Sequence, residues 1–323
     1  MALVKRENSE PCFYSNRLFV TPSNLELARV LCRHYWRFAR KKIRELFYFD
    51  QWYLMYAVAH SNAPSTSVWR FPEVLPPKDR FWADPFLLYR DGKYYVFFED
   101  FCYATQKGHI SYFVLDERGN RTEPKKIIDQ PYHLSYPFLF EYQGETYMIP
   151  ESAQNRTIEL YRCLKFPEKW GPAAVLMRNI YAVDATLHQA DGLWWMFVNV
   201  RENDGGSSCE ELFLFFSSDP LSADWTPHPA NPVVSDVKSA RPAGRIFEMN
   251  GELYRPSQDS SRGYGYAIRI NRIEMLTTTE YREVCISGIE PNWNPAVTAV
   301  HTLNFQGNVT FLDGLKRRGK YFG

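Results

Sequence analysis

The chain has 323 residues and a formal charge of +1, with 45% hydrophobic and 16% aromatic residues. This length allows one large domain or two ordinary ones, and the near-zero charge argues against a nucleic-acid-binding protein. The 23 Phe, 21 Tyr and 9 Trp residues suit short strands, because flat side chains pack well on pleated, half-buried surfaces. Sugar-binding clefts also use aromatic side chains, although core packing is their commoner task.

The cysteines indicate a reducing environment. The six are scattered and none forms a CxxC pair, which argues against a zinc ribbon and against a disulfide scaffold. No apolar run approaches the roughly 20 residues that cross a bilayer, and the N-terminus lacks the apolar region of a signal peptide. We therefore expect a cytoplasmic protein, and we add the hypothesis of a peripheral position on the inner membrane face.

Residues 1–49 are predicted to form an N-terminal extension that contains a basic amphipathic helix over 23–47. Thr21, Pro22 and Ser23 supply a start signal for this helix. Part of its surface is apolar, through Leu27, Val30, Leu31, Phe38 and Leu46, and the rest is basic, through Arg29, Arg33, Arg37, Arg40, Lys41, Lys42 and Arg44. Two interpretations stay open: a helix packed on the main domain with a solvated basic face, or contact with an anionic membrane surface.

After Trp52 the sequence changes to short strands and turns, and an internal repeat of about fifty residues becomes visible. Each repeat has a turn glycine between two apolar, aromatic-rich runs, as in ADPFLLYRDGKYYVFFE. An Asn-Gly or Asp-Gly pair between such runs predicts a hairpin, because both turn residues accept a positive φ. The five turn glycines are Gly92, Gly144, Gly192, Gly251 and Gly307.

Five units of about fifty residues correspond to one four-stranded blade each, which is the period of a β-propeller. Each unit alone would expose an apolar face that radial stacking buries. The segment 52–58, WYLMYAV, is a candidate strand for closing the ring. The predicted fold class is therefore all-β, with a five-bladed β-propeller over residues 50–323 preceded by the helical extension. A β-sandwich with accidental spacing is the alternative.

Hairpin geometry predicts which residues share one end of the blades. If each turn has two residues, polar groups recur eight residues before or seven after the turn glycine, at one mouth of the central channel. The predicted cross-strand pairs are Asp84–Glu99, Tyr136–Glu151, Asp184–Asn199, Ala243–Gln258 and Ala299–Gly314, of which the fifth offers nothing polar. Opposed carboxylates about 5 Å apart raise one pKa, so one acid of such a pair can hold a proton near neutral pH.

Other polar residues are placed near the same mouth by their positions. These candidates for substrate binding are His133, His188, Arg241, Arg245 and Asp259. Carboxylates and amides suit sugar hydroxyls, and arginine suits a phosphate or carboxylate. Each residue also has a structural interpretation, such as a strand end or an internal ion pair. Packing is favoured for His188. The prediction of a common site rests only on the shared position of the polar residues relative to the hairpin turns.

Several motifs are absent. The sequence has no GxGxxG, GxxxxGK[ST], GxSxG or HExxH. No Asp-x-Asp is present, so a metal-held sugar nucleotide lacks its usual ligands, and clusters of His and Cys are missing. We therefore predict neither a metal site nor a cofactor.

Several longer words of the sequence resemble one known family. WADPF, HLSYPFLFE followed by GETYMIPES, IELYR with FPEKW, VDATL, SARPAG and RPSQDSSRGYG resemble the N-terminal domain of plant glucosamine inositolphosphorylceramide transferase. The domain recurs in bacterial proteins, some of them linked to formyltransferase-like domains. The resemblance covers roughly residues 50–290. It implies a five-bladed propeller similar to furanosidase and arabinanase hydrolases.

The resemblance to those hydrolases implies roles for individual residues. Asp84 in WADP corresponds to the base or nucleophile, and Asp184 in VDAT to the acid that orients and tunes it. The hydrolases' general acid has no counterpart on the fourth blade, which carries Ala243, Arg245 and Gln258 instead, and Glu151 is a candidate substitute. A leaving group such as phosphate needs no such acid, which favours transfer or binding over hydrolysis.

The leading hypothesis is a carbohydrate-active propeller that performs glycosyl transfer in cell-surface glycan or glycolipid synthesis. Asp84, Asp184 and Glu151 are the catalytic candidates. The substrate-binding candidates are Glu99, His133, Tyr136, His188, Asn199, Arg241, Arg245, Gln258 and Asp259. Expected partners are a glycan, glycolipid or activated sugar, the membrane surface through residues 23–47, and a partner transferase domain. The alternatives are a furanosidase-like hydrolase and a non-catalytic glycan-binding or scaffold module.

Overall fold

The computed structural model describes residues 22–58, 63–65 and 67–321. Residues 1–21 of the predicted extension, Cys12 among them, lie outside this part. The chain divides into two compact units, one comprising Met1–Tyr48 with Gly319–Gly323 and the other Phe49–Arg318. The five described cysteines are all free, as their scattered positions suggest.

The first unit contains one long helix, α1 (Asn24–Phe47). Its start follows from a capping box, in which the Ser23 hydroxyl accepts from the Glu26 backbone N–H while the Glu26 carboxylate accepts from the Ser23 backbone N–H. The observed helix matches the predicted one to within a residue at each end. Among the described residues, no helix is both long and apolar enough to cross a bilayer.

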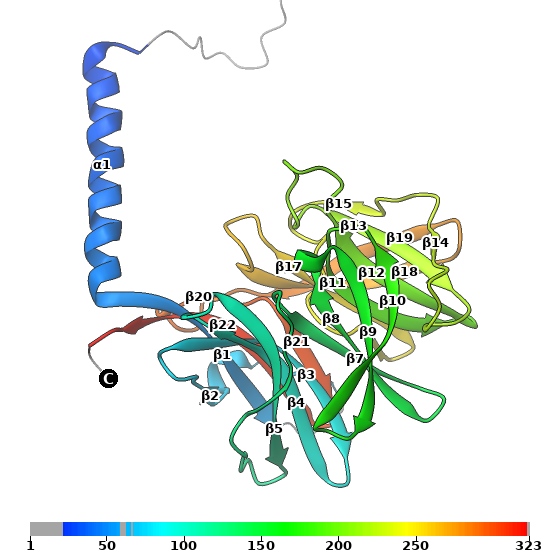
Figure 1. Cartoon of the computed structure of the whole chain (residues 1–323). Helices are drawn as coiled ribbons and strands as arrows, with labels where there is room; N and C mark the ends of the chain where they lie inside the picture. Colours follow the sequence, from blue (N-terminus) through cyan, green and yellow to red (C-terminus); the bar gives the residue numbers. More distant parts are fainter. Residues whose placement is uncertain (1–21, 59–62, 66, 322–323) are drawn as a thin grey trace, which may run out of the picture. The chain divides into compact units, whose positions relative to one another are not determined.

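The second unit is a ring of five antiparallel sheets, which confirms the predicted five-bladed propeller (Figure 1). Blade 1 consists of β3 (Arg80–Arg90), β4 (Lys93–Cys102), β5 (Lys107–Asp116) and β6 (Lys125–Ile128). Blade 2 consists of β7 (Ser135–Tyr142), β8 (Glu145–Ser152), β9 (Thr157–Lys165) and β10 (Lys169–Arg178).

The remaining blades vary in their outer strands. Blade 3 consists of β11 (Ala182–Ala190), β12 (Leu193–Val200), β13 (Glu211–Ser217), β14 (Thr226–Pro227) and β15 (Val234–Ser235). Blade 4 consists of β16 (Phe247–Met249), β17 (Glu252–Asp259), β18 (Ala267–Leu276) and β19 (Tyr281–Ile289). Blade 5 consists of β20 (Val297–Ala299), β21 (Leu303–Gln306), β22 (Val309–Gly319), β1 (Tyr48–Val58) and β2 (Glu73–Val74).

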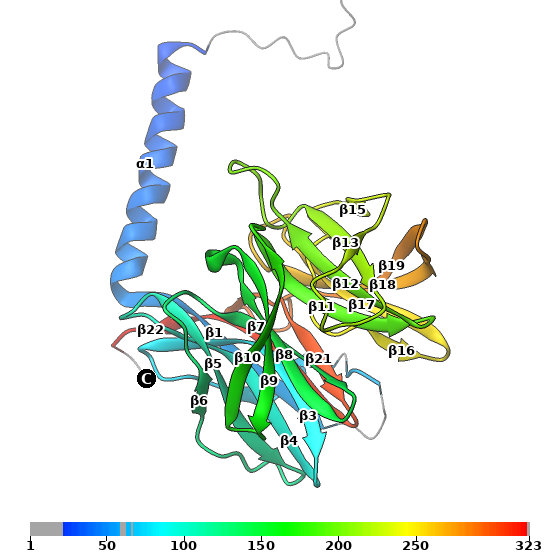
Figure 2. The ribbon, with the colours of Figure 1, turned by 45° about the vertical axis from the view of Figure 1, so that its right-hand side comes forward.

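The ring closes in blade 5, where β1 from the start of the propeller pairs with β22 from its end. The predicted closing segment 52–58 lies within β1, so that prediction is confirmed. Inner strands of successive blades then lie side by side, with β3 between β21 and β7, and β7 next to β11 (Figure 2). The core lies between blades, where aromatic rings such as Phe86 and Phe138 pack edge to face.

Four of the five predicted hairpin turns are confirmed. Asp91–Gly92, Gln143–Gly144, Asp191–Gly192 and Asn250–Gly251 each join two paired strands with both turn residues at positive φ. The fifth prediction is wrong by one residue. Gln306 pairs with Val309, so the turn is Gly307–Asn308, with the glycine in the first position.

The predicted cross-strand pairs are wrong by one or two residues, and in blades 1, 2 and 3 the cause is a repeated bulge. The innermost strands of blades 1, 2 and 3 each contain one residue at positive φ beside a register shift, which adds an unpaired residue. The bulge residues are Asp84, Tyr136 and Asp184. The observed pairs are Ala83–Glu99, Ser135–Glu151, Val183–Asn199, Pro242–Ser257 and Ala299–Leu315.

Blades 4 and 5 meet too closely at Gly244 for any side chain. Its φ is +135°, and an added Cβ would lie 2.0 Å from the backbone oxygen of Leu303. We expect Gly244→Ala to lower the free energy of unfolding by about 2 to 5 kcal/mol, because a strained φ and a backbone clash both contribute. Urea denaturation measures this loss.

Gly263 is the matched control for that substitution. Its φ is +136°, but a Cβ there would meet nothing within 4 Å. Gly263→Ala should therefore cost only about 1 to 2 kcal/mol, from backbone strain alone. Equal losses for the two variants would show that the Leu303 contact is unimportant.

Candidate functional site

A polar cavity of about 170 Å³ lies where the inner strands converge, and we call it the axial cavity. The structure brings several predicted site residues together there. Those that line it are Asp84, Glu99, His133, Glu151 and Arg241. Its other lining residues are Trp52, Phe81, Ala83, Phe101, Ser135, Tyr264 and His301. Such a mixture of acids and aromatic faces suits a sugar, whose hydroxyls need hydrogen bonds and whose C–H faces need apolar contact.

Asp84 is positioned by the bulge in β3. At φ 52° it can lie in the left-handed region because its side chain is short and polar. The Asp84 carboxylate accepts from the Thr302 hydroxyl at 2.7 Å and from the Tyr136 backbone N–H at 3.2 Å. These donors fix the carboxylate between blades 1, 2 and 5, with 4% of the residue exposed.

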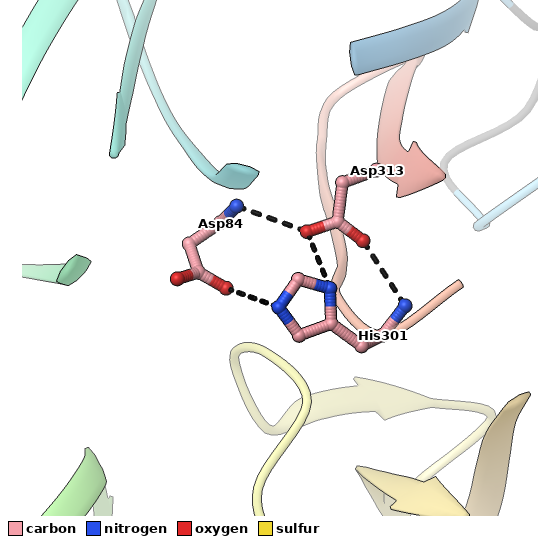
Figure 3. Close-up of side chains that lie close together, drawn as sticks. All are labelled: Asp84, His301 and Asp313. Atoms are coloured by element: carbon pink, nitrogen blue, oxygen red, sulfur yellow. Dashed lines mark hydrogen bonds and ion pairs between the residues drawn. The ribbon is translucent and has the colours of Figure 1, made fainter. Parts of the chain in front are cut away.

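His301, in blade 5, lies between the carboxylates of Asp84 in blade 1 and Asp313 in blade 5 (Figure 3). Its Nε2 is 3.3 Å from Asp84 Oδ1, and its Nδ1 is 2.8 Å from Asp313 Oδ2. Burial alone would lower the pKa of His301, but Asp313 and Asp84 together hold it above its usual value. Asp313 also accepts from the backbone N–H groups of His301 and Asp84, so it orients both neighbours.

Asp184 occupies the equivalent bulge of blade 3 and pairs with Arg241. The Arg241 Nε donates to Asp184 Oδ2 at 2.6 Å, and Gln258 Nε2 donates to the same oxygen at 2.9 Å. Arg241 also lies 3.5 Å from Glu151 Oε2. Burial would lower the pKa of Arg241, but Asp184 and the other groups around it hold it well above its usual value. The guanidinium therefore stays charged and compensates the acids around it.

Two further acids that line the cavity, Glu99 and Glu151, have raised pKa values. Burial, followed by the negative charge of Asp84, raises the pKa of Glu99 well above its usual value. Burial and the neighbouring Asp184 likewise raise the pKa of Glu151 well above its usual value, against the opposing effect of Arg241. Both carboxyls can therefore hold a proton near neutral pH.

Asp84 is the third acid of the cavity with a raised pKa. Burial raises the pKa of Asp84 to about 6, and the charge of His301 limits that rise. His133 Nε2 lies 3.5 Å from Glu99, but burial lowers the pKa of His133 to about 4, so its ring is neutral at pH 7. The cavity thus gathers three carboxyl groups whose pKa values are raised, and such groups can exchange protons with a substrate.

Among the described residues, Asp84, His301 and Asp313 form the one group of His, Cys, Asp or Glu whose ligand atoms could surround a metal ion, within 4.8 Å of one another. These atoms already serve each other. The imidazole lies between the two carboxylates, and Asp313 accepts three backbone N–H groups, from Asp84, His301 and Thr302. The Asp313 oxygens are therefore already engaged by backbone donors, which makes this set less suited to a cation.

The structure places the other predicted residues away from the cavity lining. Tyr136 and Asn199 are fully buried, and Arg245 donates to the Leu139 backbone oxygen. Asp259 pairs with Arg269 at 2.6 Å. His188 does not line the cavity either, and burial lowers its pKa.

Trp52, Tyr264, His301 and Asp313 are among the cavity or supporting residues that were not predicted from the sequence. The predicted pairing of Ala299 with Gly314 placed no polar group of blade 5 at the mouth of the channel. That prediction is wrong, because His301 of this blade lines the cavity. A signal was present in the acid within FLDGL, which resembles the acid within VDATL. The ring centroid of Trp52 is 4.1 Å from that of His301. Trp52 is brought to the cavity by closure of the ring, and no local sequence pattern indicates that position.

The family described as glucosamine inositolphosphorylceramide transferase 1, N-terminal, matches residues 73–294, which is more than half of the chain. The chain belongs to this family. The protein named glucosamine inositolphosphorylceramide transferase 1 from rice, Oryza sativa subsp. japonica, is 40% identical over 214 residues, 65% of this chain and 28% of that protein. The Arabidopsis thaliana protein of the same name is 38% identical over 207 residues, 63% of this chain and 27% of that protein.

The match therefore spans little more than a quarter of these relatives' length. In solved structures, the propeller resembles the catalytic domain of a Coprinopsis cinerea α-L-arabinofuranosidase, with TM-score 0.54, 12% identity and coverage of 83% of this chain and 98% of that chain. It also resembles a family 117 glycoside hydrolase from Zobellia galactanivorans, with TM-score 0.51, 11% identity and coverage of 83% and 90%. At these identities the likeness concerns the fold alone.

Proposed function

We propose that the axial cavity binds one sugar residue and performs glycosyl transfer in the synthesis of a glycolipid or cell-surface glycan. The observation that carries this proposal is the convergence of Asp84, Glu99 and Glu151 on one aromatic-walled cavity. The pKa of Asp84 is raised to about 6, and burial raises the pKa values of Glu99 and Glu151 well above their usual range. A pair of carboxyl groups, one that donates a proton and one that accepts it, is the usual requirement for breaking and forming a glycosidic bond.

Each acid has a proposed task. Asp84, as a carboxylate, accepts the proton of the acceptor hydroxyl while that oxygen attacks the anomeric carbon. Glu151 donates its proton to the departing oxygen as the old bond breaks, unless the leaving group is a phosphate that needs none. Asp184 acts as a positioning residue, because its bond to Arg241 holds that guanidinium 3.5 Å from Glu151. Arg241 then faces a phosphate or carboxylate on the ligand.

The names of the relatives support transfer rather than hydrolysis. Both plant proteins carry the name of a transferase that acts on a glycolipid. They are much longer than the matched region, so a partner transferase domain or protein is part of the proposal for this chain. The sphingolipid in their name is not part of it.

Furanosidase-like hydrolysis is the second candidate, and Glu151 favours it. An unactivated glycoside needs a general acid, and Glu151 lines the cavity with a pKa raised by burial and by Asp184. Water would then replace the acceptor hydroxyl, and Asp84 would activate it.

One experiment separates these candidates. The purified chain is incubated with sugar nucleotides, lipid-linked sugar phosphates and aryl furanosides, and products are detected by mass spectrometry. Transfer to an added acceptor supports the leading proposal, and release of free sugar from furanosides supports hydrolysis. Ligand binding in calorimetry without turnover of any substrate would replace both with a non-catalytic glycan-binding module.

The pH dependence of this activity is predicted by the two kinds of acid. Since Asp84 must be ionised, kcat/KM should rise with pH through about 6. Since Glu151 must be protonated, kcat/KM should fall again at higher pH, and Glu151→Gln should remove that fall along with most of the rate. A rate that rises monotonically to alkaline pH in the wild type would contradict the assignment of Glu151.

Helix α1 supports a proposed location at the cytoplasmic side of a membrane. Its helical spacing gathers Leu27, Leu31 and Phe38 on one face and places Arg33 and Arg37 outside that face. A helix with an apolar face and a basic face lies in the interface of an anionic bilayer. We therefore propose peripheral attachment that keeps the propeller near lipid-linked substrate.

Substitution of the basic face tests this attachment. We expect Arg33→Gln and Arg37→Gln each to weaken binding to phosphatidylserine vesicles by about fivefold, since each basic residue contributes about 1 kcal/mol. Vesicle flotation at low and high salt measures the effect. Arg282→Gln, on the exposed strand β19, is the control, and an equal effect there would argue against a specific role of α1.

A further inference from the structure

A second hollow, of about 840 Å³, lies against blade 1, and we call it the blade-1 groove. Side chains alternate between the two faces of a strand. On β3 and β4, Phe81 and Glu99 line the axial cavity, whereas their neighbours Trp82 and Asp100 line the groove. The two hollows therefore lie on opposite faces of one sheet, and they share no lining residue.

The floor of the groove is a row of polar groups across three strands. Asp100 pairs directly with Trp82 of β3 and with His109 of β5. The Asp100 carboxylate lies 3.4 Å from Arg80 Nη1 and from Ser111 Oγ, and 3.6 Å from His109 Nε2. All of these residues line the groove, so the carboxylate belongs to its floor.

Two polar atoms of this floor lack a partner among the described residues. Asp100 is 3% exposed and Trp82 is 5% exposed, yet Asp100 Oδ1 and Trp82 Nε1 form no hydrogen bond. Buried acceptors and donors are usually paired, because an unpaired polar group keeps its desolvation cost. A ligand hydroxyl can serve both, since it donates to the carboxylate and accepts from the indole N–H.

The charge of the lining favours an anionic ligand. It contains five lysine or arginine side chains and three acids. Lys107 and Lys126 both pair with Asp129. Within the described residues, Arg121 and Arg318 form no ion pair. Arg318 Nη1 donates instead to neutral acceptors, the Gln51 side chain and the Pro76 backbone oxygen.

We propose that the blade-1 groove binds a phosphorylated sugar or polyol. The phosphate is held by Arg121 and Arg318, because guanidinium groups match its geometry. A ring hydroxyl is held by Asp100 and Trp82. The volume lies within the roughly 300 to 1,000 Å³ that is typical of ligand pockets. The ligand is either a free sugar phosphate or the phosphorylated headgroup of a glycolipid, which share this chemistry.

Calorimetry on the full chain tests the site with three probes: glucose 6-phosphate, glucose and inorganic phosphate. Glucose 6-phosphate is expected to bind more tightly than either of the others. Trp82→Phe keeps the ring but removes the N–H, and Asp100→Leu keeps a similar volume but removes the acceptor. Each should weaken binding by about fivefold or more, the usual effect of a lost buried hydrogen bond, and Arg121→Gln, at the exposed rim, by about tenfold.

Several outcomes would overturn the proposal: no binding of glucose 6-phosphate, equally tight binding of inorganic phosphate, or affinity unchanged in both Trp82→Phe and Arg121→Gln. Arg241→Met distinguishes the two sites, because Arg241 lines the axial cavity and not the groove. It should leave the affinity for glucose 6-phosphate unchanged, and a loss of affinity in that variant would place the ligand in the axial cavity. The groove and the proposed chemistry can therefore fail independently.

Vesicles distinguish the two sources of ligand. Flotation is compared between phosphatidylinositol and phosphatidylserine vesicles of equal charge, so that any contribution of α1 is the same in both. A lipid headgroup is the source if Trp82→Phe weakens binding to phosphatidylinositol alone. If Trp82→Phe binds both kinds of vesicle as tightly as the wild type does, the ligand of the groove is a free sugar phosphate.

Discussion

Asp84→Asn is expected to reduce turnover by about 10² to 10⁴-fold, the usual contribution of a general base, while ligand binding persists. Asparagine tolerates the left-handed conformation that β3 imposes at φ 52°, so the bulge should survive the change. The amide still accepts from Thr302 but cannot take up a proton from an acceptor hydroxyl. Initial rates on whichever donor the wild type uses, with calorimetry on the same ligand, measure the two effects separately.

The matched control for this substitution is Asp191→Asn. Asp191 also has a positive φ, of 51°, but it lies exposed in the turn between β11 and β12. The same chemical change there should leave both turnover and binding intact. If Asp84→Asn retained full turnover, the assignment of Asp84 as the base would be excluded.

Arg241→Met is expected to lower the free energy of unfolding at neutral pH by about 3 to 5 kcal/mol, because it leaves buried negative charge uncompensated. Arg241 Nε is 2.6 Å from Asp184, and its Nη2 is 3.5 Å from Glu151. Addition of Asp184→Asn to this variant removes the stranded charge and should recover at least half of the loss. Urea denaturation of the single and double variants measures this coupling.

Arg255→Met provides a comparison outside the cavity. Arg255 is also buried, and it pairs with Glu283 at 2.5 Å in blade 4. Its replacement should cost a similar amount of stability and leave affinity for the axial ligand unchanged. Arg241→Met should also weaken binding of the axial ligand, because Arg241 lines the cavity. An equal loss of affinity in Arg255→Met would show that general destabilisation, rather than the contact to the ligand, explains the result.

The fold was largely predictable because its signals are local. A turn needs residues that accept positive φ, and a strand needs alternating or continuous apolar residues, so Asp91–Gly92 and its counterparts mark each hairpin in the sequence. The register was less accessible. Asp84, Tyr136 and Asp184 have positive φ inside a strand. An Asn-Gly pair predicts a turn, but no residue type predicts a bulge of this kind.

The candidate site was predictable where one hairpin supplies it and not where the ring assembles it. Asp84 and Glu99 come from adjacent strands, so their proximity follows from pairing. His301 and Trp52 are brought to Asp84 by ring closure, over separations that hairpin arithmetic does not reach. The partners of Arg241 depend on packing between blades 2, 3 and 4, and so could not be assigned in advance.

Tyr136 has a consequence for how the blades of the propeller are held together. This fully buried side chain starts in blade 2, and its hydroxyl bonds to Thr186 of blade 3 and to the backbone N–H of Gly244 in blade 4. Its reach from the second blade to the fourth links three blades through one hydroxyl group. One side chain therefore fixes the relative positions of these blades, two of which carry the acids Glu151 and Asp184.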